Sequence, residues 1–132
     1  MEKIRITPLE RKVLRHCLRE PYDPALFPSD WQEAWKSLMD KAGKFIQDND
    51  LIDEMMDYTP DSNLLVWFDY RLALQTLNKE ALRRIEDSPF KINEFSPEEL
   101  RGIMSEVRAE KRGDAVLDGV LWFKMEPFKA SI

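Results

Sequence analysis

Residues 64–77 read LLVWFDYRLALQTL, and this stretch decides the fold. Ten of its fourteen residues are apolar or aromatic, and on a helix they would point in every direction. A helix that is hydrophobic all round has to be buried on all sides, either by its own chain or by a partner. We therefore expect the other segments of the chain to wrap around this one.

The same spacing of apolar residues continues past Leu77 through Ala81 and Ile85. The sequence therefore predicts one central helix over residues 63–85, about 34 Å long at the rise of an α-helix. Its first half should be enclosed by other helices. Its second half should lie at the surface, because charged residues appear from Lys79 onward.

Other helices are predicted from start signals followed by apolar residues spaced by threes and fours. Thr7, Pro8 and Glu10 suit the cap and first turn of a helix over residues 8–19. After a proline-rich loop, Ser29 and Gln32 resemble a second capping box. That box opens a helix to about residue 48, which is followed by a shorter helix over residues 51–56.

The strongest helix signal in the chain lies near residue 96. Ser96 suits the N-cap, Pro97 the first helical position and Glu99 the closing position of a capping box. Gly113 is a natural residue just beyond the end of this helix.

Both ends of the chain carry weaker signals. Residues 3–7 alternate between polar and apolar side chains, which is typical of a short strand. The pair Asp118-Gly119 between apolar arms favours a hairpin turn, although the apolar spacing of residues 116–121 also fits a helix capped by Asp114.

We therefore expect a mainly α fold, a single-domain helical bundle over residues 1–132 with about five helices around the central helix 63–85. A small β-hairpin or strand pair from residues 3–7 and 115–125 would be added to it. The composition, 43% hydrophobic and 34% charged, fits such a domain.

The chain shows no sign of a membrane or secretory destination. Its longest apolar run, residues 64–68, is far shorter than the roughly 20 residues that span a bilayer. The N-terminus is charged and lacks an apolar signal core, and the lone Cys17 cannot form an internal disulfide. We expect a cytoplasmic protein.

No pattern of catalytic or cofactor-binding residues is present. The only histidine, His16, adjoins the only cysteine, and neighbours on a helix point about 100° apart. None of the four glycines belongs to a phosphate-binding loop. We expect a protein without catalytic residues, cofactor or metal, and His16 as a residue at the edge of the core.

The acidic run that begins at Asp48 resembles a calcium loop only in its charge. The fifth, sixth and twelfth positions of such a loop need an oxygen ligand, a glycine and an acidic side chain. Here they hold Ile52, Asp53 and Thr59. A solvated acidic face is the better interpretation, with cation binding as the alternative.

The absence of a catalytic motif favours a protein that acts by binding another protein or itself, for example as a homodimer. Trp31 and Trp35 on the second helix are candidate contact residues. Asp69 and Arg71 interrupt the central helix, where a charge has to be paired or reach solvent. They would form either a narrow solvent window or a polar contact across a subunit interface.

The alternative hypothesis is a helix-turn-helix-like regulator that binds nucleic acid. Residues 7–14 resemble the first helices of such regulators, and the basic face of helix 8–19 would provide the contacts through Arg11, Lys12, Arg15 and Arg19. However, the net charge is −5, and the loop over residues 20–28 is longer than the turn of that motif. Nucleic acid is therefore not the expected partner.

Overall fold

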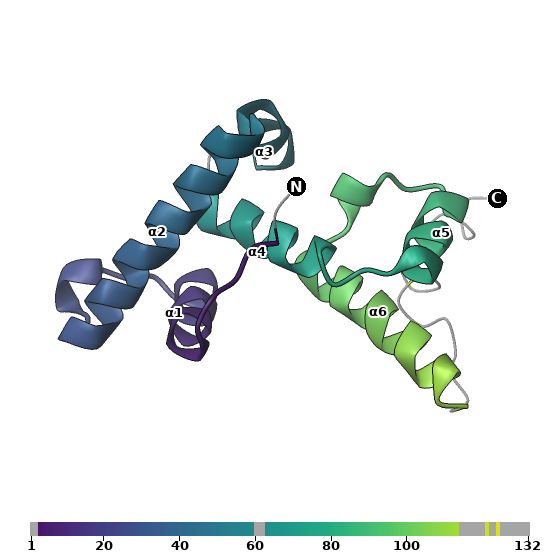
Figure 1. Ribbon diagram of the computed structural model, residues 1–132, viewed down its shortest axis with the longest axis horizontal. Helices are drawn as coiled ribbons and strands as arrows, with labels where there is room; N and C mark the ends of the chain where they lie inside the picture. The colour runs from purple at the N-terminus through teal and green to yellow at the C-terminus, as the bar shows by residue number, and fades with distance from the viewer. Residues whose placement is uncertain (1–2, 60–62, 114–120, 122–123, 125–132) are drawn as a thin grey trace. The chain divides into compact units, whose positions relative to one another are not determined.

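The computed structural model describes residues 3–59, 63–113, 121 and 124. In these residues the chain is mainly helical, which confirms the predicted fold class, and no β-strand is present. The chain divides into two compact units, Met1–Leu72 and Ala73–Ile132, with the boundary inside the helix Leu64–Leu74, which Figure 1 labels α4. Within the described part, no helix is both long and apolar enough to cross a membrane. A single 1–132 domain stays a prediction.

The first unit is built on two packed helices, α1 (Pro8–Arg19) and α2 (Ser29–Asn49). The predicted capping box is present at α1, where the Glu10 amide donates to Thr7 Oγ1 at 3.1 Å and the Thr7 amide donates to Glu10 Oε1 at 2.8 Å. Six apolar side chains of the two helices are buried: Val13, Leu14, Ala34, Leu38, Ala42 and Ile46.

The capping box predicted at Ser29 is wrong. No side chain caps α2, and Gln32 Nε2 instead donates to the carbonyl oxygens of Ala25 at 3.2 Å and Phe27 at 3.0 Å. These carbonyls belong to the loop that contains η1 (Pro24–Leu26), so Gln32 stabilises the loop and not the helix end. At its other end α2 stops at Asp50, which adopts a left-handed conformation with φ 53°. A short helix, α3 (Ile52–Tyr58), follows.

The single central helix predicted over residues 63–85 is also wrong, because the chain forms two helices there. They are α4 (Leu64–Leu74) and α5 (Lys79–Asp87). Thr76 Oγ1 donates to the Ala73 carbonyl at 2.7 Å, and Asn78 Oδ1 accepts from the Ala81 amide at 2.9 Å as the N-cap of α5. Polar side chains that bond the nearby backbone in this way compete with a continuous helix.

The apolar character of α4 is matched by its burial. Trp67 and Phe68 are fully buried, and Leu65 and Tyr70 are at most 4% exposed. In contrast, α5 has one buried and one exposed side, because Ala81 is buried whereas the following Leu82 is exposed. The expected burial of the first half is confirmed.

The second unit contains α5, η2 (Ile92–Glu94) and α6 (Pro97–Lys111), and α5 packs against α6. The predicted capping box at α6 is confirmed by hydrogen bonds of 3.1 and 2.9 Å between Ser96 and Glu99. Gly113 has φ 83°, as expected for a glycine beyond a helix end. The core of this unit consists mainly of Ile85, Phe95, Leu100, Ile103 and Val107.

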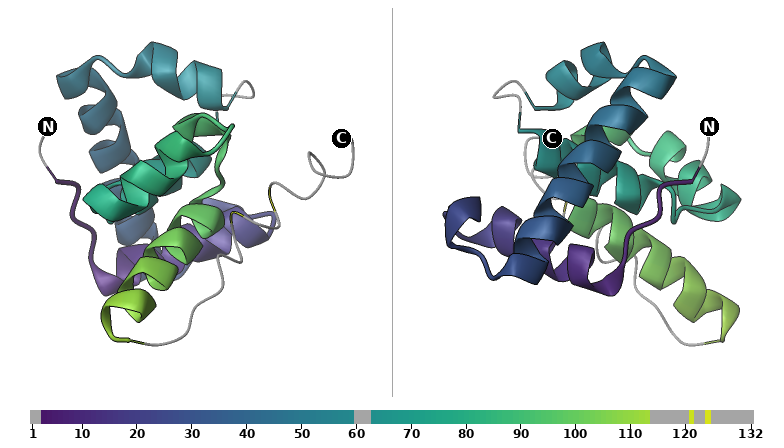
Figure 2. Two further views of the ribbon diagram at one scale, coloured as in Figure 1. Left: turned by 90° about the vertical axis from the view of Figure 1, so that its right-hand side faces the viewer. Right: turned by 60° about the vertical axis from the view of Figure 1, so that its left-hand side comes forward.

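The predicted strand at residues 3–7 is not formed. The segment is irregular and runs beside α2, and a helix offers no edge for strand pairing (Figure 2). Of the hairpin or strand predicted over residues 115–125, only Leu121 and Lys124 are described, and both are helical. The rest of that prediction lies outside the described residues.

Candidate interaction surfaces and a basic groove

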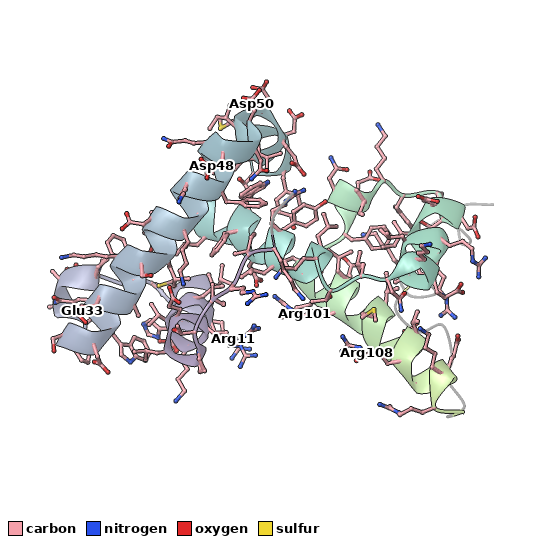
Figure 3. The ribbon with its side chains drawn as sticks, in the orientation of Figure 1. Arg11, Glu33, Asp48, Asp50, Arg101 and Arg108 are labelled. Carbon is pink, nitrogen blue, oxygen red and sulfur yellow. The ribbon has the colours of Figure 1, made fainter. Side chains whose placement is uncertain are left out.

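The four cations predicted as a nucleic-acid-binding face lie on α1, and all are exposed: Arg11, Lys12, Arg15 and Arg19. Three of them are spaced by one helical turn and form a row. None of the four forms a salt bridge with a carboxylate in the described part of the chain. Arg11 projects from the side of α1 that faces away from α2 (Figure 3). This row is therefore an unneutralised positive surface.

An aromatic cluster holds the proline-rich loop next to this row. The His16 ring lies 5.8 Å from the Phe27 ring and 5.6 Å from the Trp31 ring, both edge to face. Tyr22 stacks on Phe27 at 6.1 Å. His16 thus acts as a packed, half-buried aromatic residue, as expected for a position at the edge of the core. The loop still presents Leu26, which is 81% exposed.

Trp35, the second predicted contact residue, lies one turn after Trp31 on α2 and is half-buried. Its indole Nε1 is buried and has no hydrogen-bond acceptor among the described residues. The same holds for Nε1 of the fully buried Trp67. Both tryptophans therefore contribute through the packing of their rings and not through a hydrogen bond to another described residue.

Asp69 and Arg71 do not form the solvent window considered from the sequence. Asp69 is only 9% exposed. Arg71 Nη1 donates to Glu54 Oε1 at 2.9 Å, and its guanidinium lies 5.5 Å from the centre of the Phe45 ring and 5.8 Å from that of Trp67. Arg71 is thus ion-paired within its own chain.

The buried tyrosine beside these charges stays neutral. Tyr70 stacks on Tyr58 with ring centres 4.2 Å apart. Burial raises the pKa of Tyr70 to about 12, and the nearby Glu54 charge adds to this shift. Tyr70 is therefore a packing residue and not an acid or base at neutral pH.

The four predicted partner-binding residues do not form one cluster. Trp31 contacts His16 and Phe27, whereas Arg71 contacts Phe45. Trp31 and Phe45 are fourteen residues apart on α2, which corresponds to about 21 Å along the helix. Any joint role of the four residues would need a partner that covers most of α2.

The acidic run lies at the end of α2 and on α3. Four carboxylates are exposed there: Asp48, Asp50, Asp53 and Asp57. Figure 3 labels the first two at the end of α2. The neighbouring Ile52 and Met56, one turn apart on α3, are 49% and 42% exposed. No group of acidic, histidine or cysteine side chains in the described residues is arranged to hold a metal ion.

A basic groove lies between the N-terminal segment and α2, with a volume of about 530 Å³. Its lining residues come from these two elements only: Lys3, Ile4, Arg5, Lys41, Lys44, Phe45, Asp48 and Asn49. Lys41 Nζ donates to Glu10 Oε1 at 2.7 Å. The other three cations of the groove, Lys3, Arg5 and Lys44, form no salt bridge within the described residues.

Glu10 joins α1 to α2 beside this groove and is only 3% exposed. Burial by itself would raise the pKa of Glu10. Hydrogen bonds from Lys41 and the Thr7 amide outweigh that effect, so the pKa lies below its ordinary value of 4.5. Glu10 therefore remains a carboxylate at neutral pH and holds the Lys41 ammonium in place.

The groove was not predicted from the sequence. The alternation in residues 3–7 placed Lys3 and Arg5 on one side, and Lys41 and Lys44 are one turn apart. Nothing in the sequence indicates that these two pairs meet, because their elements are distant along the chain. In comparisons with known protein families, curated proteins and solved structures, the chain matches none of them.

Proposed function

We propose that this protein is a non-enzymatic, cytoplasmic regulator, inhibitor or accessory factor that acts by protein–protein contact, beginning with a second copy of its own chain. The observation that carries the proposal is the charge complementarity of two exposed surfaces in the first unit. The basic surface consists of Arg11, Lys12, Arg15 and Arg19 with Tyr22 and Leu26. The acidic surface consists of Asp48, Asp50, Asp53 and Asp57 with Ile52 and Met56.

Each surface combines charge with exposed apolar side chains. Interfaces between proteins typically have an apolar centre and a polar rim. Leu26 and Met56 would gain from burial in such a centre. The charged rows around them would determine the orientation of the two chains and reject a like-charged surface.

The two surfaces lie at different levels of α2. The contacts of Trp31 with His16 and of Lys41 with Glu10 place α1 beside the first part of α2. The acidic surface begins at Asp48, about 10 Å beyond Lys41 along the helix. A two-fold arrangement of two copies that placed each basic surface on the partner's acidic surface would make this contact twice.

The proposal is tested by measuring the solution mass by sedimentation equilibrium at low and high salt. We expect a dimer that dissociates as salt rises, because exposed charge pairs are screened. The double variant Arg11→Glu/Arg15→Glu should be monomeric at low salt, and so should Asp53→Lys/Asp57→Lys. Combining the two reversals should restore the dimer. Lys36→Glu, an exposed position outside both surfaces, is the matched control.

A monomer under all conditions, or a dimer unaffected by the charge reversals, would contradict the proposal. Nucleic-acid binding by the same basic surface is the alternative outcome. It would appear as a salt-dependent shift of a DNA or RNA duplex that Arg11→Glu/Arg15→Glu abolishes in a monomeric protein. The arrangement of the helices as a bundle likewise stays a prediction.

A further inference from the structure

We propose that the basic groove binds a phosphorylated small molecule with an amino-bearing aromatic group, of which an adenine nucleotide is the simplest example. This inference goes beyond the proposed self-association: the groove shares no residue with the basic surface and shares only Asp48 with the acidic surface, so variants at Arg5, Arg11, Arg15 and Lys44 test the two proposals separately. It rests on the size of the groove, on the source of its charges and on the order of its side chains along α2.

The size and charge of the groove fit a small anion. Its volume of about 530 Å³ lies within the range of roughly 300–1,000 Å³ that is usual for small-molecule sites. Four of its eight lining residues are cations, against one carboxylate, Asp48. Lys3, Arg5 and Lys44 have no carboxylate partner among the described residues, and their mutual repulsion would be relieved by a bound phosphate group.

The fourth cation is already held in position. Lys41 Nζ is bonded to the buried Glu10, whose second hydrogen bond, from the Thr7 amide, ties it to the start of α1. A lysine fixed in this way loses little side-chain entropy when a ligand binds. Glu10 thus fixes the position of Lys41 at one end of the groove, although Glu10 itself does not line the groove.

The side chains of α2 in the groove follow an order with two different ends. Positions 41, 44, 45 and 48 lie on one face of the helix. Lys41 and Lys44 mark the cationic end, and Asp48 lies about 10 Å from Lys41 along the axis. A phosphate group would be attracted to the first end and repelled by the second.

An apolar wall separates these two ends. Phe45 and Ile4 are half-buried and line the groove. The Phe45 ring is held by Trp67, with ring centres 6.0 Å apart, and by Arg71. A ring that is fixed but partly exposed provides a surface on which an aromatic group of the ligand can pack.

The far end accepts hydrogen bonds. Asp48 offers carboxylate oxygens. Asn49 uses its amide nitrogen to donate to the Phe45 carbonyl at 2.9 Å, which leaves its side-chain oxygen as an acceptor. An aromatic group that carries an amine satisfies this end, whereas one with a carbonyl in that place does not.

The test is isothermal titration calorimetry of the full chain with ADP, IDP, adenosine and pyrophosphate. We expect ADP to bind, with adenosine and pyrophosphate each at least about tenfold weaker because each lacks one half of the ligand. IDP, which has a carbonyl in place of the adenine amine, should bind several-fold more weakly than ADP. ADP should also raise the unfolding temperature, because it binds only the folded chain.

Charge-reversal variants distinguish ADP binding in the groove from nonspecific attraction of ADP to the positive charges of the chain. Lys44→Glu and Arg5→Glu should each weaken ADP binding by at least about tenfold, whereas Lys36→Glu, the same change at an exposed site of α2 outside the groove, should not. Arg11→Glu/Arg15→Glu should retain ADP binding even where it abolishes self-association. Absence of saturable ADP binding, equal effects of Lys44→Glu and Lys36→Glu, or pyrophosphate binding as tightly as ADP would overturn the proposal.

Discussion

The two units join their helices by the same kind of ion pair but bury it differently. In the first unit Lys41 pairs with Glu10, whose side chain is 4% exposed. In the second unit Arg84 pairs with Glu110, whose side chain is 40% exposed. A buried carboxylate depends on its partner because water cannot replace it, whereas an exposed carboxylate is solvated when its partner is lost. The first unit should therefore be more sensitive to substitution and to acid.

The units also differ in how they use their cations. Arg83, Arg84 and Lys124 of the second unit are paired with carboxylates of that unit. Lys124 Nζ also lies 4.8 and 4.9 Å from the ring centres of Phe90 and Phe95. In the first unit the α1 row and most of the groove cations have no carboxylate partner in the described residues. These three cations of the second unit therefore stabilise its fold, whereas the α1 row and most of the groove cations of the first unit remain available for binding.

The largest expected effect comes from truncating one core leucine in each unit. Leu38 and Leu100 are both fully buried, so Leu38→Ala and Leu100→Ala should each cost about 3 kcal/mol of unfolding free energy. If residues 1–132 form a single domain, urea denaturation followed by circular dichroism should show one transition that both variants shift. Two transitions, each moved by only one variant, would instead mean that the units unfold separately.

A smaller effect should distinguish the two ion pairs directly. Glu10→Ala removes a buried carboxylate that bonds both Lys41 and the Thr7 amide, and we expect a loss of about 2 kcal/mol. Glu110→Ala removes a partly exposed partner and should cost about 0.5 kcal/mol. Urea titrations of the two variants under the same buffer provide the comparison. Equal losses would show that burial of the pair does not matter.

The acid sensitivity of the first unit should follow from Glu10. Its pKa is lowered in the folded chain, so its contribution to stability is present above the unfolded value and is lost as pH falls below 4.5 through the folded pKa. The unfolding free energy of the wild type should decline over this window. That of Glu10→Gln should decline less, although other carboxylates contribute in both proteins. Parallel pH profiles would rule out this role.

Local sequence signals predicted a helix cap correctly where both hydrogen-bonding residues lie within one turn of each other. The capping boxes of Thr7 with Glu10 and Ser96 with Glu99 are of this kind, and both are formed. Gln32 also had the right spacing, but carbonyl groups of the preceding loop bind its amide. Local spacing does not predict such competition.

Longer-range features were missed for a similar reason. The helical spacing of apolar residues continues through Leu74 and Leu77, so it predicted one helix where the chain forms α4 and α5. Asn78 did indicate a break, because asparagine is a residue type that caps helices. The pairing of Arg71 with Glu54 and the basic groove both depend on the approach of separate elements. Residue types indicated charges that must be paired or solvated in helix 63–85 and a basic face on helix 8–19, but only the fold determines which groups meet.

The smallest effects, of opposite sign, should come from one glycine in each unit. Gly43 lies inside α2, and an added Cβ would have no neighbour within 4 Å. Gly43→Ala should therefore stabilise the chain by about 0.5–1 kcal/mol, because alanine has the higher helix propensity and restricts the unfolded chain.

Gly113 also has space around it, but its φ of 83° strains any residue that carries a Cβ. Gly113→Ala should destabilise by about 1 kcal/mol, and its melting temperature should fall where that of Gly43→Ala rises. Because neither added methyl group meets a clash, the difference in sign isolates the backbone conformation as its cause.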